Sequence, residues 1–366
     1  MKQVLLTFAL TIAVGIVVQS QTTMDFETYN PPSTMVVPQH ITTKAKFPFI
    51  DIHNHQDDMP DQNLNELVKI MDTLNMAVMV NLSGSNGNKL KQAINNIKAN
   101  APKRFVVFVN IDFDGIGKSN WTENAVKQLE EDVKNGAGGL KIFKNLGFSV
   151  KDNQGKRVAV HDQRLDAIWK KCAELNIPVL IHTADPKPFW DPVDKNNERW
   201  LELTTRPNRK RSDTDPEPWQ QLIDEQHRMF KKHPQTTFIA AHFGWYANDL
   251  EKLGKLMDDM KNVYVEFGAV IAELGRQPLA ANKFFTNYQD RILFGKDSWV
   301  PEEYTTYFRV LETKDEYFPY HKKYHAFWRM YGMDLPDEVL RKVYYKNALK
   351  LLPSLDKTLF PLEAHY

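Results

Sequence analysis

The sequence has a single cysteine, Cys172, among its 366 residues. One thiol excludes a disulfide within the chain, and it excludes a zinc site built from cysteine ligands. Cys172 lies in a stretch with the apolar spacing of a helix, so we expect a small buried residue there and not a nucleophile. A chain of this length can bury a large apolar core, so it needs no disulfides for stability.

The net charge of the chain is also close to zero, and long apolar runs are few. The 47 lysines and arginines nearly balance the 46 aspartates and glutamates, which leaves a net charge of +1. This balance indicates neither a nucleic-acid partner nor binding to an anionic membrane surface. After the first twenty residues the sequence has no apolar run long enough to span a bilayer.

Residues 1–20 have the pattern of a signal peptide. Lys2 precedes an apolar run over 4–18, and we expect cleavage before Gln21. An uncleaved anchor is the alternative, but the run is short for a membrane span. We therefore expect an exported protein, periplasmic or extracellular, with no membrane contact once the signal is removed. Residues 21–46 are polar with three prolines and predict an irregular lead-in.

From residue 47 onward, short apolar runs alternate with amphipathic stretches. The runs are typical of buried strands, and the stretches between them have apolar residues at the three- and four-residue spacing of helices. Strands that alternate with helices imply parallel pairing and right-handed crossovers. Eight such units predict an α/β fold, the (β/α)₈ TIM barrel, over 47–366. An open doubly wound sheet is disfavoured because no glycine-rich phosphate turn follows the first run.

The expected strands cover 47–53, 77–81, 105–111, 139–143, 178–182, 237–242, 263–267 and 291–294. The expected barrel helices cover 65–74, 89–99, 123–134, 163–175, 219–232, 247–260 and 279–287. Three later stretches, 302–311, 320–331 and 336–352, predict a C-terminal helical extension.

One connection is unusually long. Residues 184–217, after the fifth strand, include five prolines before Glu217 together with Phe189, Trp190 and Trp200. Connections of this length are typically functional or disordered. The aromatic residues leave two readings open, an ordered excursion over the site or an insertion with a small core of its own.

Polar side chains recur where the predicted strands end. The first strand ends in His53-Asn54-His55, and residues two apart on a strand point to the same face, so both imidazoles can bind one metal ion. His182, His242 and Asp297 end the fifth, sixth and eighth strands. In this type of barrel the chemistry lies at those strand ends. Imidazole and carboxylate ligands suit Zn²⁺, and also Mn²⁺ or Fe²⁺.

This set of residues resembles the amidohydrolase superfamily. Two segments are similar to the motifs of its amidohydrolase-related branch of metal-dependent TIM-barrel enzymes, Asp51-Ile52-His53-Asn54-His55 and Phe294-Gly295-Lys296-Asp297-Ser298. The resemblance implies that one divalent metal, expected to be Zn²⁺, is bound by His53, His55, His182 and Asp297. It implies that His242 lies beside the metal to polarise a substrate carbonyl or orient water, and that Asp297 transfers a proton.

The resemblance implies a small-molecule substrate but does not choose the reaction. The leading hypothesis is a hydrolase that cleaves an amide, lactone or ester with a metal-activated water. The alternative is a non-oxidative decarboxylase of an aromatic or unsaturated acid on the same scaffold. A binding protein without catalysis would be favoured had one of the five metal-site residues been lost, and all five are present.

Four further residues are candidates at the site. Lys141, on the fourth strand, could become carboxylated and bridge a second metal, or it could contact a substrate anion. Arg276 could bind a substrate carboxylate, or it could form a salt bridge with Glu273. Trp190 and Trp245 could form walls of the pocket.

Two other stretches, one basic and one rich in aromatic residues, predict no particular site. The basic cluster 209–211 predicts a solvated loop. The aromatic-rich stretch 304–320 predicts packing on the barrel rim or a contact between subunits, which leaves a homodimer open.

Overall fold

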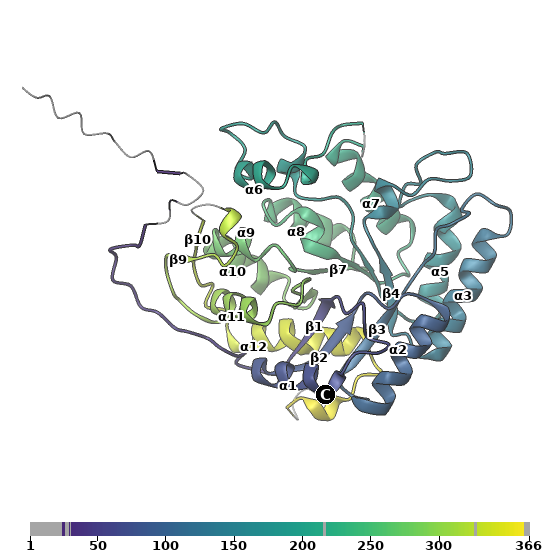
Figure 1. Cartoon of the computed structure of the whole chain (residues 1–366), viewed down its shortest axis with the longest axis horizontal. Helices are drawn as coiled ribbons and strands as arrows, with labels where there is room; N and C mark the ends of the chain where they lie inside the picture. The colour runs from purple at the N-terminus through teal and green to yellow at the C-terminus, as the bar shows by residue number, and fades with distance from the viewer. Residues whose placement is uncertain (1–23, 26–28, 30, 215–216, 326–327, 362–366) are drawn as a thin grey trace, which may run out of the picture. The chain divides into compact units, whose positions relative to one another are not determined.

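The fold was analysed in a computed structural model that describes residues 24–25, 29, 31–214, 217–325 and 328–361. The predicted signal peptide lies outside the described residues. The chain divides into two units, Met1–Thr34 and Met35–Tyr366. The second unit contains the strands and helices described below, and Figure 1 shows the labelled strands β1, β2, β3, β4 and β7 at the centre with helices around them.

Eight parallel strands pair in chain order and confirm the predicted barrel. Each carries the buried, largely apolar sequence that a strand covered on both faces requires. Their bounds are β1 Phe49–Asn54, β2 Met76–Asn81, β3 Phe105–Asn110, β4 Gly139–Ile142, β5 Val179–Ile181, β6 Phe238–Ala240, β7 Val263–Glu266 and β8 Ile292–Leu293.

Backbone hydrogen bonds between the first and last strands join the two edges of the sheet. The N–H of Ile52 donates to the carbonyl of Phe294 at 2.9 Å, and the N–H of Asp297 donates to the carbonyl of His53 at 2.7 Å. This contact places the end of β8 beside the end of β1. Two of the predicted metal ligands, His53 and Asp297, are thereby brought together although 244 positions separate them along the chain.

The predicted barrel helices are all present, with ends shifted by a few residues. In α1 the buried side chains Leu64, Leu67, Met71 and Leu74 recur at three- and four-residue spacing and face the sheet. The others are α2 Gly87–Asn100, α3 Trp121–Asn135, α5 Asp166–Glu174, α7 Trp219–Lys232, α8 Leu250–Asp259 and α10 Pro278–Asn287, with α1 at Leu64–Leu74. None of the described helices is long and apolar enough to cross a membrane.

Shorter helices occupy the connections at the carboxyl ends of the strands. They are α4 Asn145–Phe148, η2 Lys187–Phe189, α6 Trp200–Thr205, η3 Pro207–Arg209, η4 Ala241–Trp245 and α9 Ile271–Gly275. The long connection after β5 therefore has regular structure of its own. Its side chains Phe189, Leu201 and Leu203 are buried but do not belong to the contiguous apolar core of the barrel.

The C-terminal extension differs from the prediction in one segment. Helix α11, Tyr304–Glu312, and the nearly continuous helix formed by α12 Asp337–Arg341, η7 Lys342–Lys346 and α13 Asn347–Leu351 match the expected stretches. The helix predicted over 320–331 is wrong. The described part of this segment has only a short turn, η6 Lys323–His325, and strand β10 Arg329–Met330, which pairs with β9 Phe318–Pro319. Pairing with β9, and the hydrogen bond from Tyr331 N–H to the Gly275 carbonyl at 2.8 Å, override the local helical spacing.

Candidate active site

Three predicted ligand atoms converge at the junction of β1 and β8. His55 Nε2 lies 3.3 Å from His53 Nε2, and Asp297 Oδ1 lies 3.4 Å from His53 Nε2 and 3.5 Å from His55 Nε2. A point equidistant from the three atoms is about 2 Å from each, which matches zinc–nitrogen and zinc–oxygen bond lengths in proteins. His53, His55 and Asp297 therefore fit a divalent cation, and we call these three residues the triad.

The opposite nitrogen of each triad histidine is held by a neighbour. His53 Nδ1 lies 2.8 Å from Glu266 Oε1, and His55 Nδ1 lies 2.9 Å from Ser83 Oγ. The carboxylate of Glu266 can only accept while ionised, so His53 carries its proton on Nδ1 and exposes an Nε2 lone pair. Burial and the nearby Lys141 ammonium hold the pKa of His53 well below its ordinary value, so the imidazole stays neutral.

Asp297 is held by its backbone and by the imidazoles around it. Its φ of 84° is unusual for a residue with a side chain, and the bond from its N–H to the His53 carbonyl keeps it there. Burial raises the pKa of the Asp297 carboxyl, but His53, His55 and His242 outweigh burial and hold that pKa well below its ordinary value. The carboxylate is therefore ionised.

His242 and His182 form the adjoining part of the cluster. The backbone leaves β6 after Ala240 and turns through η4, where His242 has a φ of 57°. His242 Nδ1 lies 2.6 Å from the Gly268 carbonyl, and His182 Nε2 lies 3.1 Å from the Ala184 carbonyl. Carbonyls only accept, so both nitrogens donate. The remaining atoms, His242 Nε2 and His182 Nδ1, face each other at 3.3 Å.

Two unprotonated nitrogens at this distance leave two lone pairs facing each other, which a cation or a donating water would relieve. Burial lowers the pKa of His242 to about 4 and holds the pKa of His182 well below its ordinary value, so neither gains a proton near neutral pH. Among the described residues, two sets of three have ligand atoms that all lie within 4.8 Å of one another, namely the triad and the set of His53, His242 and Glu266. His182 belongs to neither set.

Glu266 ends β7 and is central to the site, although no role was predicted for it from the sequence. Its Oε1 also accepts the N–H of His242 at 2.8 Å, and its Oε2 accepts the N–H of Gly268 at 2.6 Å. The side chain is fully buried, and burial raises its pKa. The signal in the sequence was an acidic residue at the end of an otherwise apolar strand, β7.

Asp51 performs a similar task between β1 and β8. Its Oδ1 accepts the N–H groups of His53 and Lys296, each at 3.1 Å, and its Oδ2 accepts the Tyr304 hydroxyl at 2.6 Å and the Asn54 amide at 3.0 Å. Burial raises the pKa of Asp51 to about 6 despite these donors. Asp51 therefore fixes the two strand ends that carry the triad.

Lys141 lies buried next to this cluster. Among the described residues its Nζ has no hydrogen-bond partner, and it stands 5.3 Å from the centre of the Phe143 ring. Burial lowers the pKa of Lys141 to about 8, although Asp297 and Glu266 act in the opposite direction. The charge of Lys141 therefore lowers the pKa values of the nearby His53 and His182.

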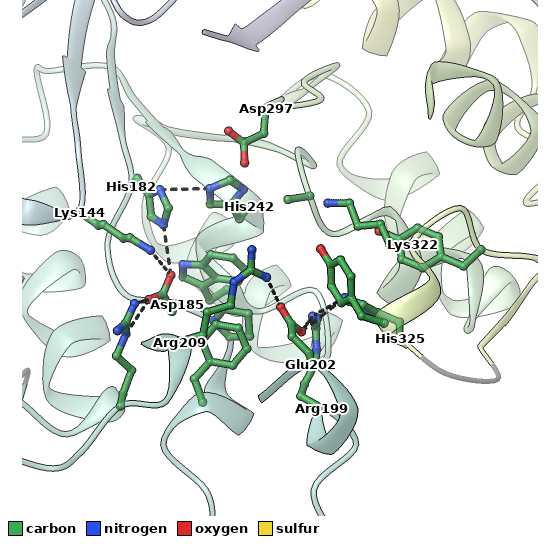
Figure 2. Close-up of a pocket in the computed structure, with 17 residues that line it drawn as sticks. Lys144, His182, Asp185, Arg199, Glu202, Arg209, His242, Asp297, Lys322 and His325 are labelled. Carbon is green, nitrogen blue, oxygen red and sulfur yellow. Dashed lines mark hydrogen bonds and ion pairs between the residues drawn. The ribbon is translucent and has the colours of Figure 1, made fainter. Parts of the chain in front are cut away.

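A cavity of about 200 Å³ is lined by Asp297 of the triad together with His182 and His242. Figure 2 shows His182, His242 and Asp297 along one side of it, with charged side chains from the long connection and the C-terminal extension along the other. Trp245 lines the cavity, and its ring centre lies 4.6 Å from that of His242. Of the described residues, the cations that line it are Lys144, Arg199, Arg209, Arg211 and Lys322.

Two predicted substrate contacts do not line this cavity. Trp190 donates its Nε1–H to the Glu217 carbonyl at 3.0 Å. Arg276 pairs with Glu198 at 2.9 Å and lies 3.6 Å from the Trp328 ring centre. The alternative pairing of Arg276 with Glu273 is also wrong, because Glu273 binds Arg199 instead.

The sequence interpretation missed the cationic wall opposite the triad. The stretch 209–211 was predicted to be a solvated loop, but Arg209 and Arg211 line the cavity. Lys322 and His325, in the segment predicted to be helical, also line it. Charged residues are so frequent in this chain that no local pattern distinguishes those that face the cavity.

The comparisons with known proteins agree with this geometry. The sequence model of the amidohydrolase family matches residues 39–354. The chain belongs to the amidohydrolase family. This amidohydrolase is therefore an enzyme, and its donor set fits the divalent metal that the family typically binds. A search of the curated proteins finds no match.

Solved structures share the fold of this amidohydrolase at low sequence identity. A TIM-barrel protein from Bordetella bronchiseptica is 14% identical, with a TM-score of 0.52 over 84% of this chain and 99% of that one. A 2,6-dihydroxybenzoate decarboxylase from Rhizobium has the same values. A dihydroxybenzoic acid decarboxylase from Polaromonas sp. JS666, with bound manganese and 2-nitroresorcinol, is 14% identical, with a TM-score of 0.53 over 86% of this chain and 99% of that one. At these identities the likeness concerns the fold alone.

Proposed function

We propose that this amidohydrolase hydrolyses an amide, lactone or ester bond in a small organic molecule with the help of one divalent metal. The observation that carries the proposal is the triad, in which His53 Nε2, His55 Nε2 and Asp297 Oδ1 lie 3.3 to 3.5 Å apart and Asp297 lines a cavity. Three ligands that leave other positions open are typical of a catalytic site, whereas a structural site is closed by protein ligands.

His182 would complete the protein ligands. Its Nδ1 carries a free lone pair at the edge of the same cluster, 3.3 Å from His242 Nε2. Zn²⁺ is the metal we expect, and Mn²⁺ or Fe²⁺ share its preference for imidazole and carboxylate. When bound, such a cation lowers the pKa of water to near 7 and polarises a substrate carbonyl.

The protonation of His242 selects one of its two expected roles. Because Nδ1 donates to the Gly268 carbonyl, Nε2 can only accept a hydrogen bond. His242 would therefore orient water from Nε2, and it would not polarise a carbonyl, which needs a donor. Asp297, ionised and about one-third exposed, would accept the proton released from water and deliver it to the leaving group.

Decarboxylation is the second candidate. The positive wall of the cavity fits an acid, and two of the structures with this fold are dihydroxybenzoate decarboxylases. In that reaction Asp297, which is ionised at rest, would first take a proton from water and then deliver it to the carbon that loses CO₂. Lys141 is buried and does not line the cavity, so it would contact a substrate anion only if the anion reached the metal-site residues. A carboxylated Lys141 that bridges a second metal is the alternative role.

The cellular context of this enzyme is also a proposal. We propose export to the periplasm or outside the cell, directed by residues 1–20, and a small-molecule substrate without nucleic-acid or membrane partners. A homodimer is a further proposal, which the elution volume of the purified protein tests. Its contact would lie outside the aromatic side chains of 304–320, because Tyr304, Tyr307 and Phe308 are buried within the chain.

The metal content of purified protein tests the proposed function. We expect about one divalent metal per chain by mass spectrometry, lost in Asp297→Ala and reduced in His182→Ala. Asp57→Ala is the matched control, because Asp57 is exposed beside the first ligands. Wild-type protein that holds no metal and takes up neither Zn²⁺ nor Mn²⁺ would defeat the proposal. A panel of lactones, esters, amides and hydroxybenzoates, scored for acid release against CO₂ release, separates the two reactions.

A further inference from the structure

The cavity carries more positive than negative charge. Five cations line it, and they face only three carboxylates, those of Asp185, Glu202 and Asp297, which leaves a net charge of +2 before any metal binds. Glu273 pairs with Arg199 from outside the cavity and reduces the excess to +1. The cavity therefore carries an excess as large as the net charge of the whole chain, which is +1.

Each carboxylate of the outer wall is shared by two cations. Asp185 pairs with Lys144 at 2.6 Å and with Arg211 at 2.7 Å. Glu202 pairs with Arg199 at 2.9 Å and also with Arg209. Neither carboxylate can neutralise both of its partners.

Within the described part of the chain, Lys322 has no carboxylate partner of its own, because Glu303, on which its charge acts, pairs with Lys296. Among the residues that the structure describes, its ammonium forms neither a salt bridge nor a hydrogen bond, although it lines the cavity. His325 beside it cannot supply a negative charge, and burial together with Arg199 and Lys322 keeps the pKa of His325 low and the ring neutral. Lys322 is only partly buried, so its ammonium is open to an anion that enters the cavity.

Arg199 and Glu202 provide a fixed base for this wall. Both are buried, and Arg199 is held between Glu202 and Glu273 with the Trp328 ring centre 4.9 Å from its guanidinium. Arg209 is more exposed, at 35% of its side chain. Figure 2 shows Arg209 and Lys322 reaching into the space between Glu202 and the group of His242 and Asp297.

We propose that Arg209 and Lys322 bind an oxyanion of the substrate, a carboxylate, phosphate or sulfate group, at the end remote from the reacting bond. The proposal rests on the proposed function, because the triad defines the reacting end. Guanidinium and ammonium groups are the usual protein partners of such anions. The substrate is then a small acid that spans the cavity, with its reacting group at the triad and its oxyanion at the outer wall.

Binding measurements on metal-loaded protein test this subsite. Succinate and inorganic phosphate serve as probes, measured by isothermal titration calorimetry, and dimethyl succinate is the uncharged counterpart of succinate. We expect Arg209→Gln and Lys322→Gln to weaken succinate or phosphate binding by about tenfold, as the loss of one charge-assisted hydrogen bond does. Lys323→Gln is the matched control, since Lys323 is exposed and does not line the cavity. The probe that binds more tightly identifies the anion.

The outcomes separate this proposal from the proposed function. The subsite is overturned if neither anion binds, if dimethyl succinate binds as tightly as succinate, or if Lys323→Gln weakens binding as much as Lys322→Gln. Binding that needs the metal and is unchanged in Arg209→Gln and Lys322→Gln would place the anion on the metal and overturn the subsite. If the protein proves to hold no metal but loses phosphate binding in both variants, the proposed function fails and the subsite stands.

Discussion

The Nδ1 atom of His53 lies 2.8 Å from Oε1 of Glu266, and both side chains are buried. This contact sets which nitrogen of His53 faces the other triad atoms. The same carboxylate accepts the backbone N–H of His242, so one side chain orients two of the histidines at the site. A residue that contacts no substrate therefore controls the donor atoms offered to the metal.

Replacing Glu266 by glutamine tests this control. The three groups that contact Glu266 are all hydrogen-bond donors. In Glu266→Gln the side-chain NH₂, which is also a donor, would therefore point at one of them without forming a hydrogen bond. We expect metal affinity to fall by about 10- to 100-fold, as when other groups that orient metal ligands are lost. Competitive titration against a metal-binding dye measures the change. Glu316→Gln, at an exposed position, is the control, and equal affinities of the two variants would contradict the assigned role.

Gly295 is the position where the site has no space for a side chain. A Cβ atom there would lie 2.3 Å from Glu266 Oε2 and 3.0 Å from His53 Cβ. We expect Gly295→Ala to displace both residues, to destabilise the fold by about 1–3 kcal/mol, and to weaken metal binding. Urea unfolding and metal titration measure the two effects. Gly155→Ala is the control for metal binding, which should be unchanged there because nothing lies within 4 Å of its Cβ position. The φ of Gly155 is 78°, which strains an alanine, so the loss of stability in Gly295→Ala is measured against wild type.

Lys141 gives a prediction for the pH dependence of stability. Its pKa is lowered from 10.5 to about 8, so the folded chain binds fewer protons than the unfolded chain between these values. The free energy of unfolding of metal-free protein should therefore rise as the pH increases from about 8 to 10.5. Below pH 8 the buried ammonium costs up to about 3 kcal/mol. Lys141→Met should be more stable than wild type at pH 7 and should lack this rise. Urea unfolding of both proteins at pH 7 and pH 10 measures this. If the stability difference between Lys141→Met and wild type is the same at both pH values, the lowered pKa of Lys141 is refuted.

The two arginines at the long connection should differ in their effect on stability. Arg199 is buried between Glu202 and Glu273, so Arg199→Leu leaves the buried Glu273 without its partner and Glu202 with Arg209 alone, at an expected loss of about 3–5 kcal/mol. Arg276 pairs with Glu198 at the surface, and Arg276→Leu should cost less than about 1 kcal/mol. Thermal unfolding of both variants checks the order, and a larger loss for Arg276→Leu would contradict it.

The sequence by itself determined the strands, the barrel helices and the histidine and aspartate residues of the triad. Alternating buried strands and amphipathic helices are local patterns, and the carboxyl ends of parallel strands meet at one edge of a barrel. His53, His55 and Asp297 could therefore be assigned to one site before their distances were known. The contact between His53 and Glu266 could not be assigned so directly, because several strands end in polar residues and only the packing of β7 beside β8 selects Glu266.

Only the tertiary structure decided which charges face the cavity. Arg276 was expected there and pairs with Glu198 instead, whereas Arg209 was expected in solvent and faces the triad across the cavity. The predicted helix over 320–331 was replaced by a short turn and a strand, which brings Lys322 to the same wall. The conformations of such connections depend on partners far away in the sequence, such as Glu273 for Arg199 and Gly275 for Tyr331, and local spacing carries no information about them.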